Sequence, residues 1–267
     1  MQPRGHPPGP GASLGEQARP CSLATTASVA TLPAVKPLKV EIWSDVACPW
    51  CWVGKRHVEE AAASFDRPIE IRWRAFELDS SAPKELDDSI DYVDRLANKY
   101  RTSRDGAQQM IDRMTEVGRQ RGLDFRFDRA RPGNTFDAHR LLAWAADSGK
   151  QTALKERLFE AYMHEGKSVA DHETLVQLAE DVGLDAERAQ SVLSSDDFAQ
   201  EARGDEATAG KLGVTGVPFF VIDGRIGVQG AQPPEVLLSA LKKAAADAPA
   251  QTVAAKAESC DAEGCEI

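Results

Sequence analysis

The chain has 267 residues, 42% of them hydrophobic, with 42 acidic and 32 basic side chains and a formal net charge of −10. No basic excess is available to meet phosphate, which excludes a general binder of nucleic acid or anionic membranes. No run approaches the ~18 apolar residues of a membrane helix, and five cysteines are too sparse for a secreted disulfide scaffold. We therefore expect one or two globular domains, with neither membrane nor nucleic acid as partner.

Residues 1–37 are predicted to be a disordered tail. They hold seven of the fifteen prolines and few large apolar side chains, a composition that does not build a core. The stretch CSLATTASVATLPAV is interrupted by polar residues and Pro33, so it does not match the apolar centre of a secretory signal. We therefore expect a cytoplasmic protein in which Cys21 is an incidental thiol.

The folded part opens with a strand, a helix and a second strand. Residues 38–44 alternate and are rich in β-formers, residues 51–65 show a helical pattern, and residues 68–78 alternate again. This order makes a βαβ unit, with Cys48 and Cys51 at the first junction between strand and helix.

The middle of the chain, residues 80–211, is predicted to be helical. Apolar residues recur at helical spacing over 86–100 and 110–117, and five more helical patterns follow between 135 and 213. Gly149, Gly166 and Gly183 stand where helix stops are expected. The pattern also allows one short strand, at residues 124–127.

The β-pattern returns after this helical stretch. Residues 217–223 and 225–230 are predicted strands joined by Asp-Gly, a strong hairpin signal. An amphipathic helix that starts at proline is predicted over 233–245. Residues 248–267 are polar and rich in alanine, and we expect a flexible tail that ends in the pair Cys260 and Cys265.

The spacing of Cys48 and Cys51 favours redox chemistry. Cys48 falls at the start of a helix, where unpaired N–H groups and the helix dipole stabilise an anion. We therefore expect its pKa to lie below the ~8.5 of a free cysteine, which makes Cys48 the nucleophile. Cys51, on the same helical face, is then set to resolve a mixed disulfide at Cys48.

A zinc site and a structural disulfide are weaker interpretations of the pair. A zinc site needs about four ligands, and no second CxxC or histidine pair is near in sequence, although Cys260 and Cys265 would supply two more thiolates. We therefore predict no metal. A structural disulfide would gain little from closing so short a loop, and a cytoplasm would tend to reduce it.

Three segments, DVACPWCWVG (45–54), RPGNTFDAHRL (131–141) and GVTGVPFFVIDGR (213–225), carry a family resemblance. In order and spacing the sequence resembles the DsbA-like thioredoxin family over residues 38–245, most of all its cytoplasmic FrnE-like branch. The resemblance implies an α/β thioredoxin fold with a large all-helical insertion after the second strand. The thioredoxin-like domain would comprise residues 38–79 and 212–247, and the insertion residues 80–211.

The resemblance also implies a cis bond between Val217 and Pro218, facing the cysteines. The backbone of Val217 would then pair with an extended substrate segment. Between the thiols, Pro49 supports the active site, and Trp50 is expected to be exposed and to contact substrate.

Four further residues are interpreted as follows. Asp45 either helps to move the Cys51 proton or accepts hydrogen bonds at the helix N-terminus. Asn134 and Thr135 form a helix N-cap, and the resemblance also places them near the active-site groove. His139 is interpreted first as a packing histidine.

The predicted function is a thiol-disulfide oxidoreductase, either oxidase or isomerase, acting on protein thiols and disulfides. Its redox group would be its own dithiol, without another cofactor, and glutathione is a candidate electron partner. The alternative is a glutathione-dependent transferase or 2-hydroxychromene-2-carboxylate isomerase of the kappa class. Those enzymes typically have a catalytic serine and no resolving thiol. This sequence has Cys48 at that position and Cys51 three residues later, which counts against the alternative. A holdase with a secondary redox pair is the third class considered.

Two questions stay open at the level of sequence. Cys260 and Cys265 are either idle tail thiols, a metal-binding pair, or a second redox pair that exchanges electrons with Cys48 and Cys51. The oligomeric state is either monomer or homodimer.

Overall fold

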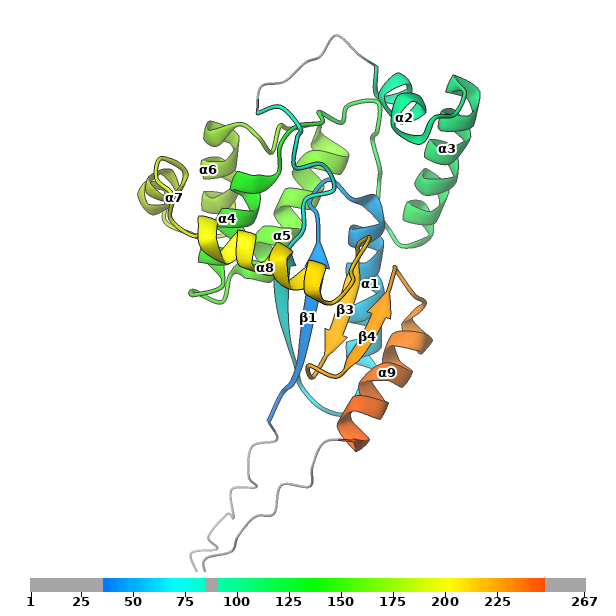
Figure 1. Ribbon diagram of the computed structural model, residues 1–267, viewed down its shortest axis with the longest axis vertical. Coiled ribbons are helices and arrows are strands. Elements are labelled where there is room, and N and C mark those ends of the chain that lie inside the picture. Colours follow the sequence, from blue (N-terminus) through cyan, green and yellow to red (C-terminus); the bar gives the residue numbers. More distant parts are fainter. Residues whose placement is uncertain (1–35, 85–90, 248–267) are drawn as a thin grey trace, which may run out of the picture. The chain divides into compact units, whose positions relative to one another are not determined.

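The computed structural model describes residues 36–84 and 91–247 (Figure 1). Within these ranges the thioredoxin-like elements are β1 (Leu38–Ser44), α1 (Pro49–Ala63), β2 (Ile69–Ala75), β3 (Phe219–Ile222), β4 (Ile226–Gln229) and α9 (Pro234–Ala246). The helices between β2 and β3 are α2 (Tyr92–Tyr100), α3 (Arg104–Gln120), α4 (Phe136–Ala145), α5 (Gln151–Glu160), the π-helical turn η1 (Ala161–Glu165), α6 (His172–Asp181), α7 (Ala186–Leu193) and α8 (Ala199–Lys211). The order matches the predicted thioredoxin fold with a helical insertion.

The four strands form one sheet in the order β2-β1-β3-β4. β1 pairs in parallel with β2, from Leu38 opposite Ile69 onward, and antiparallel with β3. A parallel pair needs a crossover connection, and α1 supplies it. Residues 223–225 join β3 to β4, and the Arg225 N–H donates to the Ile222 carbonyl at 3.1 Å across the turn. The two central residues of this turn, Asp223 and Gly224, have φ angles of 52° and 68°, the positive values that a type I′ turn requires. The predicted hairpin is therefore confirmed.

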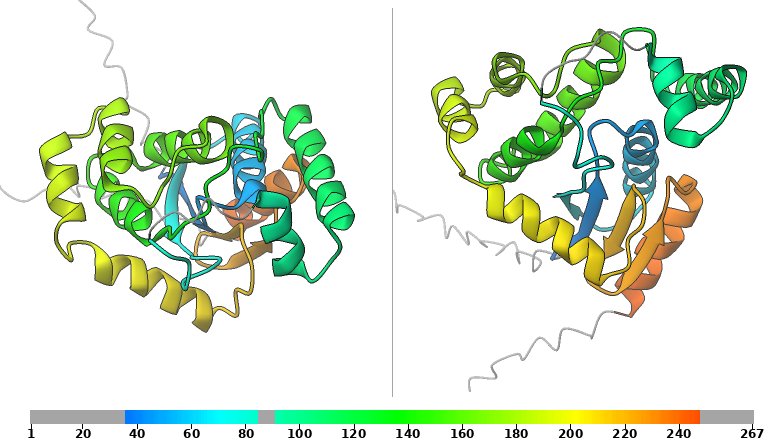
Figure 2. Two further views of the ribbon diagram at one scale, coloured as in Figure 1. Left: turned by 90° about the horizontal axis from the view of Figure 1, so that it is seen from above. Right: turned by 45° about the horizontal axis from the view of Figure 1, so that its top comes forward.

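Helices cover both faces of the sheet. α1 and α9 pack on one face, while α4, α5 and α8 contact β2 from the other (Figure 2). Side chains of β1 divide accordingly, because successive strand residues point to opposite faces. Val40 and Ile42 join a buried cluster with Leu237 of α9, whereas Trp43 packs with Ala209 of α8.

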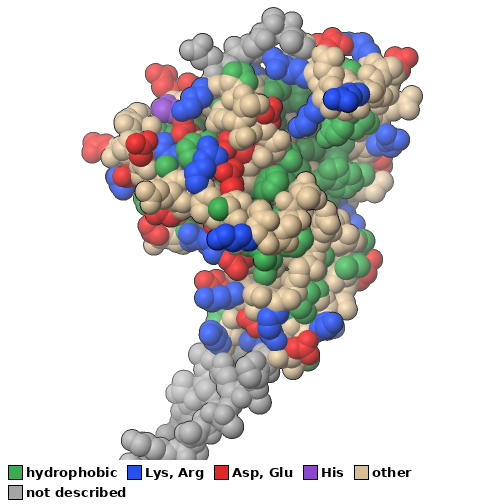
Figure 3. Space-filling model, in the orientation of Figure 1, with side chains coloured by type: hydrophobic (Ala, Val, Ile, Leu, Met, Phe, Trp, Pro, Cys, Tyr) green, Lys and Arg blue, Asp and Glu red, His purple; other side chains and the backbone are tan. Residues whose placement is uncertain are grey.

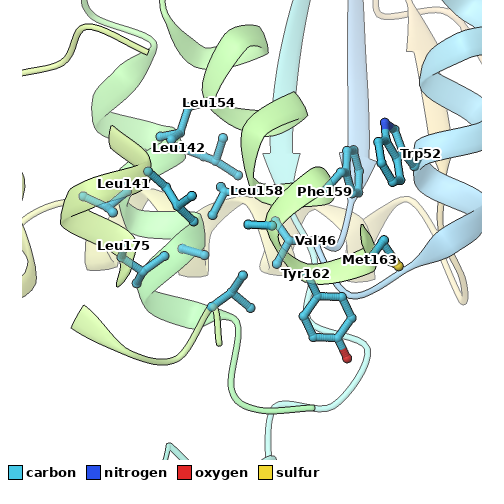
Figure 4. Packing of buried hydrophobic residues seen from close by; sticks show 14 of the residues in the cluster. Val46, Trp52, Leu141, Leu142, Leu154, Leu158, Phe159, Tyr162, Met163 and Leu175 are labelled. Carbon is cyan, nitrogen blue, oxygen red and sulfur yellow. The ribbon is translucent and has the colours of Figure 1, made fainter. Parts of the chain in front are cut away.

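The largest buried cluster joins the start of α1 to the insertion (Figure 4). Trp52 of α1 stacks on Phe159 of α5 with ring centroids 5.9 Å apart, and meets the edge of Phe125 at 5.6 Å. Cys48 and Cys51 belong to the same cluster. The first turn of α1 is therefore held between the sheet and the inserted helices, and the described residues from 36 onward form one compact unit.

The structure differs from the sequence-based expectation in a few local features. Residues 124–127 form no strand, because Phe125 and Phe127 fill the core and Phe127 stacks on Tyr92 at 5.5 Å instead of joining a ladder. Gly149, Gly166 and Gly183 do have positive φ where helices end. Of the tail predicted over residues 1–37, residues 1–35 lie outside the described part of the chain. The predicted tail at 248–267 and the start of the helix predicted from residue 86 lie outside it entirely.

Gly54 allows α1 to approach Pro218 closely. A Cβ atom at Gly54 would lie 2.9 Å from Pro218 Cγ and 3.4 Å from Phe220 Cζ, and neither ring can move aside easily. We expect Gly54→Ala to lower the free energy of unfolding by about 1–3 kcal/mol, as overpacked core substitutions do. Urea denaturation measures the change.

Gly204→Ala is the matched control. Gly204 lies inside α8 with open space where a Cβ would stand, so alanine should raise the free energy of unfolding by about 0.5–1 kcal/mol. Equal effects of the two substitutions would contradict the close approach at Gly54.

Candidate active site: a buried dithiol at the start of α1

Cys48 and Cys51 occupy the first turn of α1. Cys48 is the N-cap residue, with extended backbone (φ −98°, ψ 111°), and Pro49 is the first helical residue. Both cysteines are free thiols, and Cys48 is 4% exposed while Cys51 is fully buried. Trp50 between them is 47% exposed, as expected. Cys48 is thus the sulfur that a substrate reaches first.

The loop before β3 faces the same thiol. The Val217–Pro218 bond is cis, which confirms the implied geometry. The Cys48 thiol donates a hydrogen bond to the carbonyl oxygen of Val217 over 3.6 Å. Antiparallel pairing of β3 with β1 begins only at Phe219, so Val217 lies beyond the ladder, at the surface that surrounds Cys48.

Asp45 is a buried carboxylate behind the dithiol. Its Oδ2 accepts from the Leu78 N–H at 2.8 Å, and its Oδ1 accepts from the Ala47 N–H at 3.2 Å. Burial raises the pKa of Asp45, but His139, the Leu78 N–H and the charge of Lys155 outweigh it, so the pKa lies below the usual value. Asp45 does not cap α1, because Cys48 is the N-cap residue, and Asp45 Oδ1 accepts from the Ala47 N–H, which precedes the helix. A role in moving the Cys51 proton stays a hypothesis.

His139 of α4 stands beside this carboxylate. Its side chain is 1% exposed, and its Nε2 lies 3.5 Å from Asp45 Oδ1, close enough for an interaction between charges but poorly aligned for a hydrogen bond. The expected packing histidine is therefore also an electrostatic neighbour of the site.

The expectation of a lowered pKa at Cys48 is wrong for this structure. The interaction with Cys51, burial and the negative charge of Asp45 all raise the pKa of Cys48 well above the usual value. The helix terminus is present, but the sequence did not show that the sulfur is buried beside a second thiol and a carboxylate. Because charge on one sulfur opposes charge on the other, the pair loses its two protons in separate steps.

Lys155 is a residue of the site that the sequence interpretation missed. It lies on α5 with no exposed surface, donates from Nζ to the Ser44 carbonyl at 3.3 Å, and sits over the Phe159 ring at 5.0 Å. Burial lowers the pKa of Lys155 to about 8, although the charges of Cys51, Asp45 and Cys48 oppose that shift. A signal was present, since Lys155 interrupts the apolar face formed by Leu154 and Leu158.

A cavity of about 500 Å³ is lined by Asp45 and Ala47, which precede Cys48 in the chain, together with Tyr92, Thr135 and Tyr162. The wall places Thr135 next to the candidate site. Figure 3 shows hydrophobic side chains gathered in the hollowed part of this face, below α2 and α3.

Asn134 has the predicted role at the N-terminus of α4. Its Oδ1 accepts from the Phe136 N–H at 3.0 Å, and its Nδ2 donates to Glu77 at 3.3 Å. Asn134 therefore supplies the acceptor at the start of α4, while Thr135 lines the cavity.

Cys260 and Cys265 lie outside the described residues. Among the described helices, none has the length and apolar character needed to cross a bilayer.

These features agree with the family to which the chain belongs. The model of the DSBA-like thioredoxin domain matches residues 39–242, so the chain is a member of that family. A probable DsbA oxidoreductase from Streptomyces coelicolor, SCO1869, is 40% identical, with a TM-score of 0.75 over 86% of this chain and 99% of its own. The uncharacterized protein YwbO of Bacillus subtilis (strain 168) is 29% identical over 185 residues, 68% of this chain and 86% of its own.

More distant structures share the fold alone. The cytosolic disulfide reductase DsbM from Pseudomonas aeruginosa, in its structure with GSH, is 17% identical with a TM-score of 0.55, over 77% of this chain and 98% of its own. A 2-hydroxychromene-2-carboxylate isomerase is 16% identical with a TM-score of 0.56, over 77% of this chain and 95% of its own. Because a reductase and an isomerase match about equally well, the fold does not distinguish their activities.

Removal of Cys51 should lower the pKa of Cys48, because the interaction with Cys51 is the largest cause of its elevation. The rate of Cys48 alkylation by iodoacetamide, followed against pH in chains whose other cysteines are alanine, measures this pKa with Cys51 present and with Cys51→Ala. An unchanged or higher pKa in Cys51→Ala would show that burial alone controls the thiol.

Asp45→Asn should reduce stability by roughly 1–3 kcal/mol at neutral pH, because the amide presents N–H where a carboxylate oxygen accepts and loses the charge that faces His139 and Lys155. The pKa of Asp45 is lower folded than unfolded, so this stabilisation is complete above the unfolded value and is lost as pH falls through the folded one. The two proteins should therefore converge in urea denaturation below pH ~4. Asp66→Asn, at an exposed position, is the control and should match wild type throughout.

Proposed function

We propose that the protein is a thiol-disulfide oxidoreductase that exchanges disulfides with protein substrates through Cys48 and Cys51. The observation that carries the proposal is the placement of two free thiols in the first turn of α1, with the Cys48 sulfur against the Val217 carbonyl of the cis-proline loop. Membership of the DSBA-like family and likeness to a probable DsbA oxidoreductase support it.

In the proposed reaction the Cys48 thiolate attacks one sulfur of a substrate disulfide. A Cys48–substrate mixed disulfide forms, and the other substrate sulfur leaves as a thiolate. Cys51 then attacks Cys48, which closes the Cys48–Cys51 disulfide and releases the second substrate sulfur. The substrate gains two electrons and the dithiol loses two. The reverse sequence oxidises a substrate dithiol.

The loop before β3 would hold the substrate during these steps. Val217 lies beyond the strand pairing that begins at Phe219, so its backbone is positioned to pair with an extended segment. Trp50, exposed between the two thiols, would contact side chains next to the reacting cysteine.

We further propose a cytoplasmic setting, with glutathione as electron partner and an oxidase or isomerase direction. Likeness to a cytosolic disulfide reductase determined with GSH supports the setting and the partner. The direction depends on the reduction potential of the dithiol relative to the glutathione pool. A titration against glutathione buffers decides it.

A second candidate is a glutathione-dependent transferase or isomerase. The cavity lined by Asp45 and Ala47 and the shared fold of a 2-hydroxychromene-2-carboxylate isomerase favour it. A resolving cysteine three residues after the reactive position counts against it. Conjugation of glutathione to a model electrophile, without insulin reduction, would establish this candidate in place of the first.

We retain a second redox pair at Cys260 and Cys265 as a proposal. Under it, truncation after Glu258 leaves the core folded but slows turnover. Equal rates of insulin reduction by the truncated and full-length proteins would show that the tail has no part in turnover.

Cys48→Ala should reduce the rate of insulin reduction to the uncatalysed background, because no other sulfur at the site is exposed. Cys51→Ala should instead accumulate mixed disulfides with substrate, visible on non-reducing gels and by mass spectrometry, because nothing resolves them.

Cys21→Ala is the matched control and should behave as wild type. If Cys51, rather than Cys48, were the residue found in mixed disulfides, the two roles would be reversed.

A further inference from the structure

A second cavity lies beside the one that Ala47 lines. It has a volume of about 820 Å³, and its wall is formed by the start of α2, by α3, by the segment before α4 and by the end of η1. Tyr92, Arg95 and Pro132 belong to the walls of both cavities. Because Ala47 directly precedes Cys48 in the chain, the two cavities together lead away from the residue next to the reactive thiol.

Arginine is concentrated in the wall of the second cavity, although the chain has a net charge of −10. Apolar rings form another part of the wall, where Tyr92 and Phe127 stack with their centroids 5.5 Å apart. The charged residues of the wall are four arginines and three acids, namely Arg95, Arg104, Arg129, Arg131, Asp91, Asp128 and Glu165. Whether the cavity attracts an anion depends on which of these arginines are already neutralised.

Two of the acids are bound by cations at short distances. Asp91 Oδ1 lies 3.1 Å from Arg104 Nη2, so these two charges of the wall offset each other. Glu165 is bound by Arg157 and by Lys167, each at 2.8 Å, and neither of these cations belongs to the wall. The charge of Glu165 is therefore neutralised from outside the cavity.

Arg129 and Arg131 keep positive charges that face no close acid. The third acid of the wall, Asp128, accepts from Arg126 Nε at 3.1 Å and from Arg126 Nη2 at 2.9 Å, and Arg126 lies outside the wall. Arg129 Nε is 4.0 Å from the same carboxylate, and Arg131 forms no ion pair with any residue in the described ranges 36–84 and 91–247. Both side chains are exposed, so two guanidinium groups are available to a ligand.

The backbone that carries these arginines is held in place. The Arg126 N–H donates to the Met163 carbonyl at 2.7 Å, and the Arg129 N–H donates to the Arg126 carbonyl at 2.9 Å. Gly166, with a φ of 72°, allows a close approach, since a Cβ there would lie 2.6 Å from the Arg129 carbonyl oxygen. A backbone that is already ordered lowers the entropic cost of binding a ligand.

We propose that the second cavity binds acidic side chains of a protein substrate whose cysteine reacts with Cys48. The inference rests on the proposed function and names its substrate class, which is a polypeptide with aspartate or glutamate residues close to the reacting cysteine. In the bound substrate, the carboxylates would pair with Arg129 and Arg131.

The charge and the size of the cavities support this occupant. Guanidinium groups bind carboxylates through paired hydrogen bonds, and a concave site with apolar walls strengthens the field of its charges. Volumes of about 820 and 500 Å³ together exceed the ~300–1,000 Å³ of a small-molecule pocket, whereas an extended polypeptide can occupy both. Elsewhere the net charge of −10 repels acidic chains, so such a substrate depends on this local reversal of charge.

The binding test uses two fluorescent peptides that differ only in charge. Each peptide has serine in place of the reacting cysteine, and the residues that flank this serine are either glutamate or glutamine. Fluorescence anisotropy with the full-length protein should show roughly 5-fold tighter binding of the glutamate peptide at low salt, as two exposed ion pairs give. Added salt should reduce this preference. Repulsion by the net charge alone would instead weaken binding of the glutamate peptide at low salt, and salt would relieve it.

Charge reversal tests where the preference arises. Arg129→Glu combined with Arg131→Glu should remove it. Arg113→Glu combined with Arg119→Glu is the matched control, because both of these arginines are exposed on α3 and belong to neither cavity wall. The control changes the net charge by the same amount and should keep the preference and its dependence on salt. Should the first variant not fold, Arg129→Gln combined with Arg131→Gln replaces it and should bind the two peptides equally.

A kinetic measurement separates this inference from the proposed function. The same peptides, with cysteine joined by a disulfide to 2-nitro-5-thiobenzoate, release a coloured thiolate when Cys48 attacks the peptide sulfur. The reduced protein is used with its cysteines outside the site replaced by alanine. Below saturation, the glutamate peptide should react roughly 5-fold faster than the glutamine peptide at low salt. Equal rates would overturn the acidic preference, whereas no reaction with either peptide would overturn the proposed function of Cys48.

Three binding results would also overturn the proposal. They are equal binding of the two peptides by the wild-type protein, a preference that survives reversal of Arg129 and Arg131, and a preference that grows with salt. Truncation after Glu258 tests another occupant, because it removes the acidic C-terminal residues. If truncation strengthens binding of the glutamate peptide by more than the preference itself, the chain's own C-terminus fills the cavity, and the assignment to substrate is wrong.

Discussion

The packing of the first turn of α1 against α5 is the contact on which the site depends. Trp52 stacks on Phe159, and its Nε1 donates to Glu156 at 3.0 Å, the carboxylate that also binds Arg56. This contact joins a helix of the thioredoxin-like part to a helix of the insertion. It also removes Cys48 and Cys51 from water, and their burial determines the chemistry that follows.

Burial shifts the ionisable groups of the site in different directions. The pKa of Cys48 rises, first through its interaction with Cys51 and then through burial, and that of Lys155 falls because its ammonium loses hydration. The pKa of Asp45 falls because His139, the Leu78 N–H and the charge of Lys155 outweigh the effect of burial. The insertion contributes both His139 and Lys155. It therefore supplies two of the groups that lower the pKa of Asp45, in addition to covering one face of the sheet.

The sequence predicted most of the architecture, because periodicity and turn chemistry are local. Asp223-Gly224 identified a hairpin, and the spacing of Cys48 and Cys51 after a strand identified the first turn of α1. Contacts between distant segments were harder to predict. Phe125 and Phe127 resembled a strand until the core that they fill was known, and the pKa of Cys48 depends on neighbours that only the tertiary structure brings together. Lys155 was missed because a lysine on a helix is usually solvated.

Under the proposed function, the hydrogen bond from Cys48 to the Val217 carbonyl would couple substrate affinity to redox state. Only a protonated thiol donates to that oxygen, so the reduced, resting protein occupies its own acceptor. Ionisation or disulfide formation removes this donor, which would leave the carbonyl able to pair with the backbone of a substrate. When such a protein oxidises a substrate, its own Cys48 becomes a thiol again and would once more donate to the Val217 carbonyl. The same oxygen atom would therefore favour binding of the substrate before the reaction and release of the product after it.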